Sequence, residues 1–165
     1  MRCDGSDDGR GGLVGTTGGS TAVDSALRFV QFRNNLMGKR EKKVNTFTDF
    51  IAAGEYLAQE KFTTRGRIVA RGGSAGGMLM GAVANMAPDL FLGIIAEVPF
   101  VDVLTTMLDA SLPLTPPEWP EWGNPIESAE AYKTIAAYSP YDNVRAQGHP
   151  NILAVAGLTD PRVTY

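Results

Sequence analysis

One serine in this sequence stands in a pattern that turns serine hydroxyls into nucleophiles. Residues 72–76 match G-x-S-x-G around Ser74, after a strand-favouring stretch and before a helix-favouring one. Such a turn exposes the hydroxyl above a sheet, and it needs tiny residues two positions before and after the serine, where Gly72 and Gly76 stand. We therefore predict Ser74 as the nucleophile and the N–H of Ala75, at the start of the next helix, as one oxyanion-hole donor.

The same turn has two other interpretations. It can be a turn without chemistry, although the setting between a strand and a helix favours the nucleophile. A glycine-rich turn that opens a helix can also hold a phosphate, with Glu97 as the acidic residue roughly twenty positions downstream. That pattern needs glycine where Ser74 stands, and no lysine follows to complete a phosphate-binding loop. Dinucleotide binding is therefore not expected.

An aspartate stands where the acid of a catalytic triad belongs. In α/β hydrolases the chain order is nucleophile, acid, histidine, and the acid lies on the turn after a later strand. Asp160 follows the apolar stretch 152–156 through a short turn and fits this place. Asp102 and Asp142 are rival acids, but one opens a predicted helix and the other lies in a turn, where capping explains both. A turn or cap is also the alternative role of Asp160.

The one histidine of the sequence is out of order for a general base. His149 precedes Asp160 and stands before Pro150 at the entrance to a predicted strand, so we interpret it as a loop residue. A serine hydroxyl needs a base to become nucleophilic. We therefore expect the catalytic histidine to lie beyond Tyr165, and the chain to be a piece of a catalytic domain that is inactive alone.

The elements that position these residues alternate in type. An amphipathic helix over 46–61, opened by a capping-box-like Thr46 and Asp49, should pack on a sheet. The remaining predicted elements are strands over 67–71, 92–98 and 151–156, helices over 75–87, 101–109 and 128–138, and a proline-rich loop over 113–125. This rhythm indicates the α/β class: a mainly parallel, doubly wound sheet covered on both faces, here an incomplete α/β-hydrolase fold.

The chain divides into two segments of different composition. Glycines crowd the first nineteen positions with almost no apolar residues between them, so 1–44 is predicted to be a flexible or atypical segment. Residues 45–165 are predicted to be a partial catalytic domain. The interrupted basic run of Lys39, Arg40, Lys42 and Lys43 is interpreted as a solvated surface.

Composition excludes several function classes. A net charge of −3 and the lack of a basic stripe argue against nucleic acid or a membrane as partner. No apolar run approaches the ~20 residues that span a bilayer, and no secretory signal opens the chain. The single Cys3 predicts neither a disulfide nor a zinc site, so a cytoplasmic protein without metal or cofactor is expected.

Several long stretches of the sequence resemble the catalytic domain of the prolyl oligopeptidase family of serine peptidases. They are residues 67–77, 97–102, 112–119, 121–125 and 138–144, and the resemblance covers about residues 42–165. It implies Ser74 as nucleophile and Asp160 as triad acid, in a cytosolic enzyme that cleaves short peptides after Arg or Lys. It also implies an upstream β-propeller and a tyrosine as second oxyanion donor, which this sequence lacks, and residues 1 to about 38 depart from the family.

A basic substrate side chain requires a carboxylate in its pocket, because an unpaired buried cation is costly. Candidates are Glu118 and Glu121, which alternate with two tryptophans in the proline-rich loop. The resemblance implies Glu118 as the residue that meets the Arg or Lys side chain, with Phe100 as an apolar or cation–π wall. The alternative is that Glu118 is a surface acid of a long loop.

Two other functions stay open at this point. The same turn would serve an esterase or an acylaminoacyl peptidase of the α/β-hydrolase fold. A non-catalytic α/β module would keep the turn as structure only.

Overall fold

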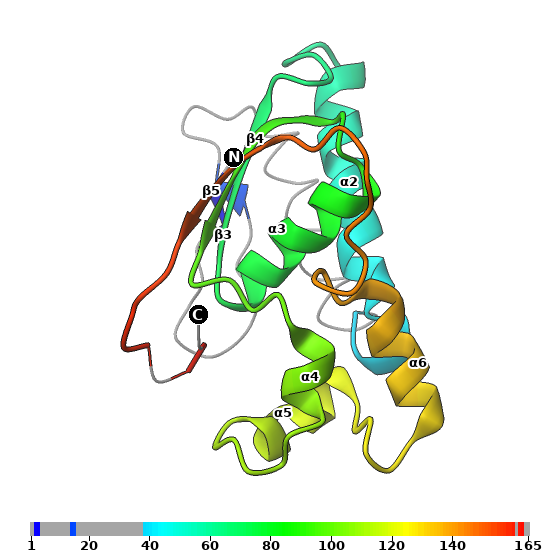
Figure 1. Ribbon diagram of the computed structural model, residues 1–165. Coiled ribbons are helices and arrows are strands. Elements are labelled where there is room, and N and C mark those ends of the chain that lie inside the picture. The colour runs from blue at the N-terminus through cyan, green and yellow to red at the C-terminus, as the bar shows by residue number, and fades with distance from the viewer. Residues whose placement is uncertain (1, 4–13, 16–37, 161, 164–165) are drawn as a thin grey trace.

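The computed structural model describes residues 2–3, 14–15, 38–160 and 162–163. Most of the segment 1–44 that we predicted to be flexible therefore lies outside the described residues. Within them, β1 (Arg2–Cys3) and β2 (Val14–Gly15) form a short antiparallel pair that lies against β3 (Ile68–Gly73). From residue 38 onward the chain forms a parallel sheet with helices packed against it (Figure 1).

Three parallel strands carry the candidate site. They lie in the order β3, β4 (Phe91–Glu97) and β5 (Asn151–Val155), with Gly73 opposite Glu97 and Glu97 opposite Val155. Their carboxyl ends therefore meet at one edge. The three strands predicted from the sequence are confirmed, each within two residues of its expected ends.

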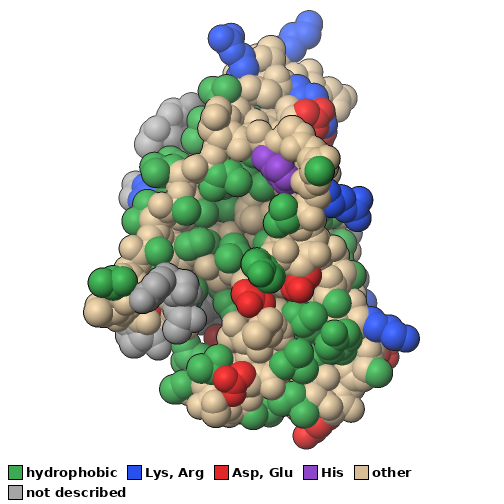
Figure 2. Space-filling view, viewed as in Figure 1, with side chains coloured by type: hydrophobic (Ala, Val, Ile, Leu, Met, Phe, Trp, Pro, Cys, Tyr) green, Lys and Arg blue, Asp and Glu red, His purple; other side chains and the backbone are tan. Residues whose placement is uncertain are grey.

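Helices cover one face of these strands. The strands follow one another without a reversal of order, and successive right-handed crossovers in one direction place their helices on the same face. The opposite face carries exposed apolar residues in the described part of the chain: Val69, Leu153 and Val155. In Figure 2 hydrophobic side chains gather in the region that β5 occupies in Figure 1. The parallel sheet with helices between its strands confirms the predicted α/β class, and the described helices lie on one face of it.

The core lies between the sheet and two helices, α2 (Val44–Gln59) and α3 (Ala75–Met86). Phe50 of α2 stacks on Phe91 of β4 with ring centroids 6.1 Å apart, so the predicted amphipathic helix does pack on the sheet. The capping box was wrong: the helix begins earlier, and its N-cap residue, Lys43, makes no side-chain capping bond. A backbone already turning at residue 43 leaves no N-cap role for Thr46.

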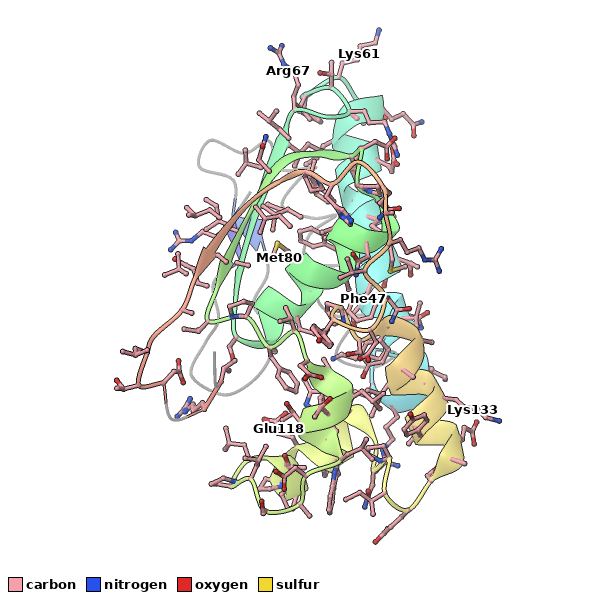
Figure 3. All side chains as sticks on the ribbon, viewed as in Figure 1. Phe47, Lys61, Arg67, Met80, Glu118 and Lys133 are labelled. Carbon is pink, nitrogen blue, oxygen red and sulfur yellow. The ribbon has the colours of Figure 1, made fainter. Side chains whose placement is uncertain are left out.

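Helix α3 is buried on most sides, as its apolar composition predicts. Met78, Met80 and Val83 are fully buried, and Figure 3 shows Met80 between the sheet and α2. Met86 at the end of α3 is exposed instead. The helix ends before Pro88, because proline disfavours helical backbone at the residue before it.

A group of shorter helices lies beyond the carboxyl edge of the sheet (Figure 1). They are α4 (Val103–Met107), α5 (Thr115–Trp122), α6 (Ala129–Tyr138) and the short 3-10 helix η1 (Arg40–Lys42). Asp102 caps α4 by accepting the Thr105 N–H at 3.2 Å, which confirms its predicted structural role. In the part of the chain that is described, no helix is long and apolar enough to cross a membrane.

The predicted proline-rich loop is wrong at its centre, because residues 115–122 form α5. Proline is tolerated in a first helical turn, where its missing N–H has no partner, and Pro116 stands there. Pro120 lies inside the helix and removes a bond, yet Trp122 is buried in the core and holds this turn in place. Gly123, at a φ of 99°, ends the helix.

Candidate active site

Ser74 adopts a strained backbone conformation at the carboxyl edge of the sheet. It stands between β3 and α3 with φ 53° and ψ −119°, a region that non-glycine residues rarely occupy. Its N–H donates to the Glu97 carbonyl at 2.9 Å, and its carbonyl accepts the N–H of Gly77 at 2.9 Å and that of Met78 at 3.1 Å. The residue itself is exposed. This geometry is the predicted sharp turn that presents a serine hydroxyl to solvent.

Two positions at this turn leave no room for a side chain, and the sequence predicted only one of them. A Cβ on Gly72 would lie 2.3 Å from the Gly76 carbonyl oxygen, so Gly72 must be glycine as expected. A Cβ on Gly76 would meet nothing within 4 Å among the described residues, which contradicts the prediction for that position. The crowded neighbour is Gly77, whose Cβ would lie 2.5 Å from the Pro99 Cα. The close approach comes from the chain after β4, which sequence spacing does not reveal.

The start of α3 leaves an N–H group available beside the serine. Helix geometry gives the first residues no intrahelical acceptor, and no described group accepts a hydrogen bond from the Ala75 N–H. The positive end of the helix dipole lies at the same point. The Ala75 N–H can therefore donate to an oxyanion formed at Ser74.

Asp160 lies at the same edge of the sheet, on the turn after β5. One of its carboxylate oxygens, Oδ1, accepts the N–H groups of Arg162 at 2.8 Å and Val163 at 3.0 Å. The N–H groups of Val163 and Arg162 hold the pKa of Asp160 below its usual value. The other oxygen, Oδ2, has no hydrogen-bond partner among the described residues. The carboxylate is therefore fixed on one side and available to a further donor on the other.

His149 lies at the opposite edge of the sheet from Ser74. It precedes β5, whereas Ser74 follows β3, and these strands run parallel. A five-residue strand is about 17 Å long, far beyond hydrogen-bond reach. The His149 ring is exposed, and its Nε2 lies 3.0 Å from the Arg145 carbonyl oxygen. The interpretation of His149 as a loop residue is confirmed.

An ion pair beside the turn joins the ends of β3 and β4. Arg71 Nε donates to Glu97 Oε2 at 2.9 Å and Arg71 Nη2 to Glu97 Oε1 at 2.6 Å. Such a two-bond pair is directional, although each side chain is about one third exposed, 35% and 36%, which limits its energy. Because the Glu97 carbonyl also binds the Ser74 N–H, the pair stiffens the strand that anchors the turn.

Phe100 and Glu118 come from different parts of the chain and are connected to Ser74 through a series of contacts. The Phe100 N–H donates to the Ser74 carbonyl at 3.2 Å. Its ring makes an edge contact with Trp122, with centroids 5.8 Å apart, and the Trp122 Nε1 donates to Glu118 Oε2 at 2.6 Å. Glu118 is half-buried on α5, beyond the carboxyl edge of the sheet (Figure 3). A continuous set of contacts thus links the serine turn to the predicted specificity acid.

Glu121 makes a different set of contacts from Glu118. Its Oε1 accepts a hydrogen bond from Lys43 Nζ at 2.8 Å, and its Oε2 lies 3.1 Å from Lys39 Nζ. The interpretation of the whole basic run as solvated was wrong for Lys43, which is 7% exposed. Burial lowers the pKa of Lys43 although Glu121 favours the charged form. Because both its oxygens are engaged by lysines, Glu121 fits a structural role better than the predicted substrate contact.

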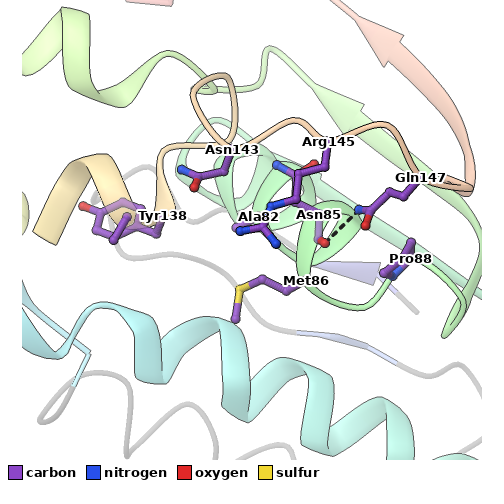
Figure 4. Close-up of a pocket in the computed structure, with 9 residues that line it drawn as sticks. Ala82, Asn85, Met86, Pro88, Tyr138, Asn143, Arg145 and Gln147 are labelled. Carbon is purple, nitrogen blue, oxygen red and sulfur yellow. Dashed lines mark hydrogen bonds between the residues drawn. The ribbon is translucent and has the colours of Figure 1, made fainter. Parts of the chain in front are cut away.

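A pocket of about 360 Å³ lies at the far end of α3, away from the serine (Figure 4). Asn85, Tyr138 and Asn143 line it, and the Gln147 amide donates to the Asn85 carbonyl at 2.9 Å. The side-chain amide of Asn143 donates to the carbonyls of Ala136 and Ser139. This pocket holds no member of the candidate site. No cluster of His, Cys, Asp or Glu among the described residues could hold a metal ion.

Sequence relatives share most of the described chain. The sequence profile of the prolyl oligopeptidase family matches residues 30–165, so it begins inside the segment that we predicted to be separate. Protease 2 of Moraxella lacunata is 56% identical over 128 residues, and dipeptidyl aminopeptidase BI of Pseudoxanthomonas mexicana is 52% identical over 128 residues. Each match covers 78% of this chain and 18% of the relative.

Solved structures of related peptidases are also similar to this chain. Oligopeptidase B from Leishmania major is 57% identical with a TM-score of 0.74, over 77% of this chain and 18% of that one. Oligopeptidase B from Trypanosoma brucei, with covalently bound antipain, is 51% identical with a TM-score of 0.77, over 81% of this chain and 19% of that one. The chain thus spans about a fifth of the length of the proteins that it matches.

Proposed function

Because this chain belongs to the prolyl oligopeptidase family, we propose that it supplies the nucleophile and the acid of a serine peptidase that hydrolyses short peptides. The observation that supports this most is the backbone of Ser74, whose positive φ is found in an exposed turn between β3 and α3. Strain of this kind persists only where the surrounding structure enforces it, and it concentrates at functional sites.

The proposed chemistry is acyl transfer through a covalent intermediate. The Ser74 Oγ attacks the carbonyl carbon of the scissile amide, and its proton passes to a general base. The Ala75 N–H stabilises the negative oxygen of the tetrahedral intermediate. The C–N bond then breaks, the amine leaves with the proton, and water hydrolyses the resulting ester in a second step.

Asp160 is proposed to orient the general base. It lies at the same sheet edge as Ser74, and its Oδ2 is unoccupied by described donors while Oδ1 is held in place. An ionised carboxylate that accepts an imidazole N–H fixes the ring and stabilises its protonated form. His149 lies at the other edge of the sheet from Ser74, so it does not serve as this base.

The substrate class is inferred from the acid that contacts through Phe100 and Trp122 link to the serine turn. We propose cleavage after Arg or Lys, with the Glu118 carboxylate pairing with the basic group and Phe100 packing on its aliphatic stem. The supporting observations are the contacts from Ser74 through Phe100 and Trp122 to Glu118. The match to oligopeptidase B structures agrees with this class. No cofactor is required for this chemistry.

A second candidate activity is the release of dipeptides from free N-termini. It is favoured by the 52% identity to dipeptidyl aminopeptidase BI. Hydrolysis of an Arg amide that carries a blocked N-terminus separates the two, because an aminopeptidase requires the free amine. An esterase or acylaminoacyl peptidase would instead prefer a simple acyl ester or a blocked amino acid. A cytoplasmic location stays a proposal, supported by the low cysteine content of this sequence.

The test is a comparison of Ser74→Ala with the wild type in the full-length protein that carries this chain. Hydrolysis of an Arg amide should fall by a factor on the order of 10⁶, as happens when a nucleophile is removed from a comparable triad. Circular dichroism checks that the variant folds. Turnover above about a hundredth of the wild-type value would exclude Ser74 as the nucleophile.

A further inference from the structure

Trp122 occupies the junction between the serine turn and the proposed specificity acid. Its side chain is 3% exposed, and it makes three contacts of different kinds. The Nε1 donates to Glu118 Oε2 at 2.6 Å, the ring meets the edge of Phe100, and the ring face lies under the ammonium of Lys43. Together the three contacts restrain the position of the indole and the direction of its N–H.

The ring is held by a buried cation. Lys43 Nζ lies 4.1 Å from the centroid of the Trp122 ring, a distance at which an ammonium is attracted to the aromatic face. The same Nζ donates to Glu121 at 2.8 Å, and Lys39 binds the other oxygen of Glu121. Lys43 belongs to the turn that opens α2, so the N-terminal end of that helix and α5 are fastened together at Trp122.

A glutamate on a short helix otherwise samples several rotamers, and immobilising such a side chain on binding costs free energy. Here the Trp122 N–H holds one oxygen of Glu118 before any substrate arrives. The second oxygen, Oε1, has no hydrogen-bond partner in the described part of the chain. It is left to accept hydrogen bonds from a guanidinium or an ammonium.

We propose that Trp122 is a positioning residue for specificity, which pre-orients the Glu118 carboxylate toward basic substrates and is itself held in place by Lys43. This inference rests on the proposed function, because it presupposes that Glu118 binds the basic side chain. It adds two residues, and neither is required to touch the substrate. Its consequence is that basic substrates alone should depend on the indole N–H.

The decisive variant is Trp122→Phe, which keeps an aromatic ring in the core and removes only the N–H donor. The efficiency kcat/KM for an Arg or Lys amide should fall about tenfold, the effect of one hydrogen bond to a charged group. The loss should appear in KM, with kcat within about twofold, and a neutral substrate should be cleaved as by the wild type.

The matched control is Trp119→Phe on the same helix. Trp119 Nε1 donates to the Met107 carbonyl at 3.2 Å rather than to Glu118, so this change removes an indole hydrogen bond with no link to the carboxylate. Its kinetics should stay within about twofold of the wild type on both substrates, since it removes no contact to Glu118. An equal loss on basic and neutral substrates for Trp122→Phe would show that Trp122 only supports the fold, and would overturn the inference.

The link to Glu118 is tested by a double-mutant cycle. Glu118→Gln and Glu118→Gln with Trp122→Phe should lose the same amount of efficiency on the Arg amide, because the indole acts only through the carboxylate. Additive losses would contradict this. If Glu118→Gln lowers kcat/KM for basic substrates only, but Trp122→Phe does not, the proposed specificity survives and the inference about Trp122 fails. If Glu118→Gln affects basic and neutral substrates equally, the proposed specificity and the inference both fail.

Lys43 gives a route that does not depend on the folding of Trp122→Phe. Lys43→Met keeps the buried stem and removes the ammonium, which lies over the Trp122 ring and also attracts Glu118. This change should alter KM for the Arg amide by about threefold and leave KM for a neutral substrate unchanged. Lys43→Arg keeps a cation over the ring and should leave KM for the Arg amide nearer to the wild-type value than Lys43→Met does. A Lys43→Met enzyme with unchanged KM for basic substrates would remove Lys43 from the proposal.

Discussion

The N–H of Phe100 donates to the carbonyl of Ser74 at 3.2 Å, which ties the segment after β4 to the turn that carries the proposed nucleophile. The same segment crowds α3, since Pro99 leaves no room for a side chain at Gly77. The proposed wall of the substrate pocket and the serine are therefore positioned by one local arrangement at the carboxyl edge of the sheet. Changes to this arrangement should affect both catalysis and substrate choice.

Gly77→Ala should destabilise the protein, while Gly76→Ala should not. An added Cβ at Gly77 meets backbone of Pro99 at 2.5 Å, and backbone cannot move away cheaply, so a cost of about 1–3 kcal/mol is expected. The Cβ of Gly76→Ala meets open space among the described residues, and alanine favours helix by about 1 kcal/mol over glycine. Thermal melting temperatures of the two variants check this predicted order of stability. A lower transition for Gly76→Ala than for Gly77→Ala would contradict the crowding at Pro99.

Asp160→Asn should reduce turnover by a factor of about 10⁴ with little change in KM, the effect of losing the triad acid in a comparable enzyme. The amide can still accept the N–H groups of Arg162 and Val163, so the turn should survive. Steady-state kinetics on an Arg amide measures the effect. A loss below about tenfold would leave Asp160 with only the turn-capping role.

The contribution of Asp160 to folding stability should depend on pH in a defined direction. The N–H groups of Val163 and Arg162 lower its pKa in the folded state below the ordinary value of 3.8. A depressed carboxyl pKa adds stability that is fully present above that ordinary value and is lost as the pH falls through the folded pKa. The acid should thus be largely ionised above pH 3.8. Titration of Asp160 by NMR near neutral pH would contradict this.

Glu118→Gln should separate basic from neutral substrates. Loss of the charge should lower kcat/KM for Arg and Lys amides, because the substrate cation would be left without its partner. The fall should correspond to a loss of roughly 2 kcal/mol or more of transition-state stabilisation. A neutral amide should be cleaved at the wild-type rate. The measurement is a pair of kcat/KM values for each variant. Equal losses on both substrates would mean that Glu118 supports α5 and selects nothing.

The 165-residue chain by itself should not hydrolyse an Arg amide. His149 is the only histidine of the sequence, and it stands at the other edge of the sheet from Ser74. A serine without a general base is a poor nucleophile. The check is an assay of the purified chain beside its Ser74→Ala variant. Hydrolysis by the chain that Ser74→Ala abolishes would show that another group serves as base.

The serine turn could be predicted from sequence because its constraints are local. A strained strand-to-helix turn restricts the residue types within a few positions of Ser74, and the flanking strand and helix follow from periodicity. The position of Asp160 followed from chain order in the fold, because parallel strands bring the ends of β3 and β5 to one edge. These inferences needed no knowledge of contacts between distant segments.

The features that sequence analysis missed depend on distant contacts. Nothing near Lys43 indicates that it is buried, because its partner Glu121 stands 78 positions away. The helix over residues 115–122 contradicts the local preference of Pro120 in its interior and is held by the burial of Trp122. The requirement for glycine at position 77 likewise arises from Pro99, on the chain after the next strand.

The central claim is that Ser74 is the nucleophile, and active-site labelling tests it most directly. The full-length protein that carries this chain would be treated with a fluorophosphonate, which phosphorylates activated serines, and digested for mass spectrometry. We predict about one adduct per chain, located on Ser74, as expected for a single activated nucleophile. An adduct on another serine, or hydrolytic activity that persists while Ser74 remains unlabelled, would contradict the claim.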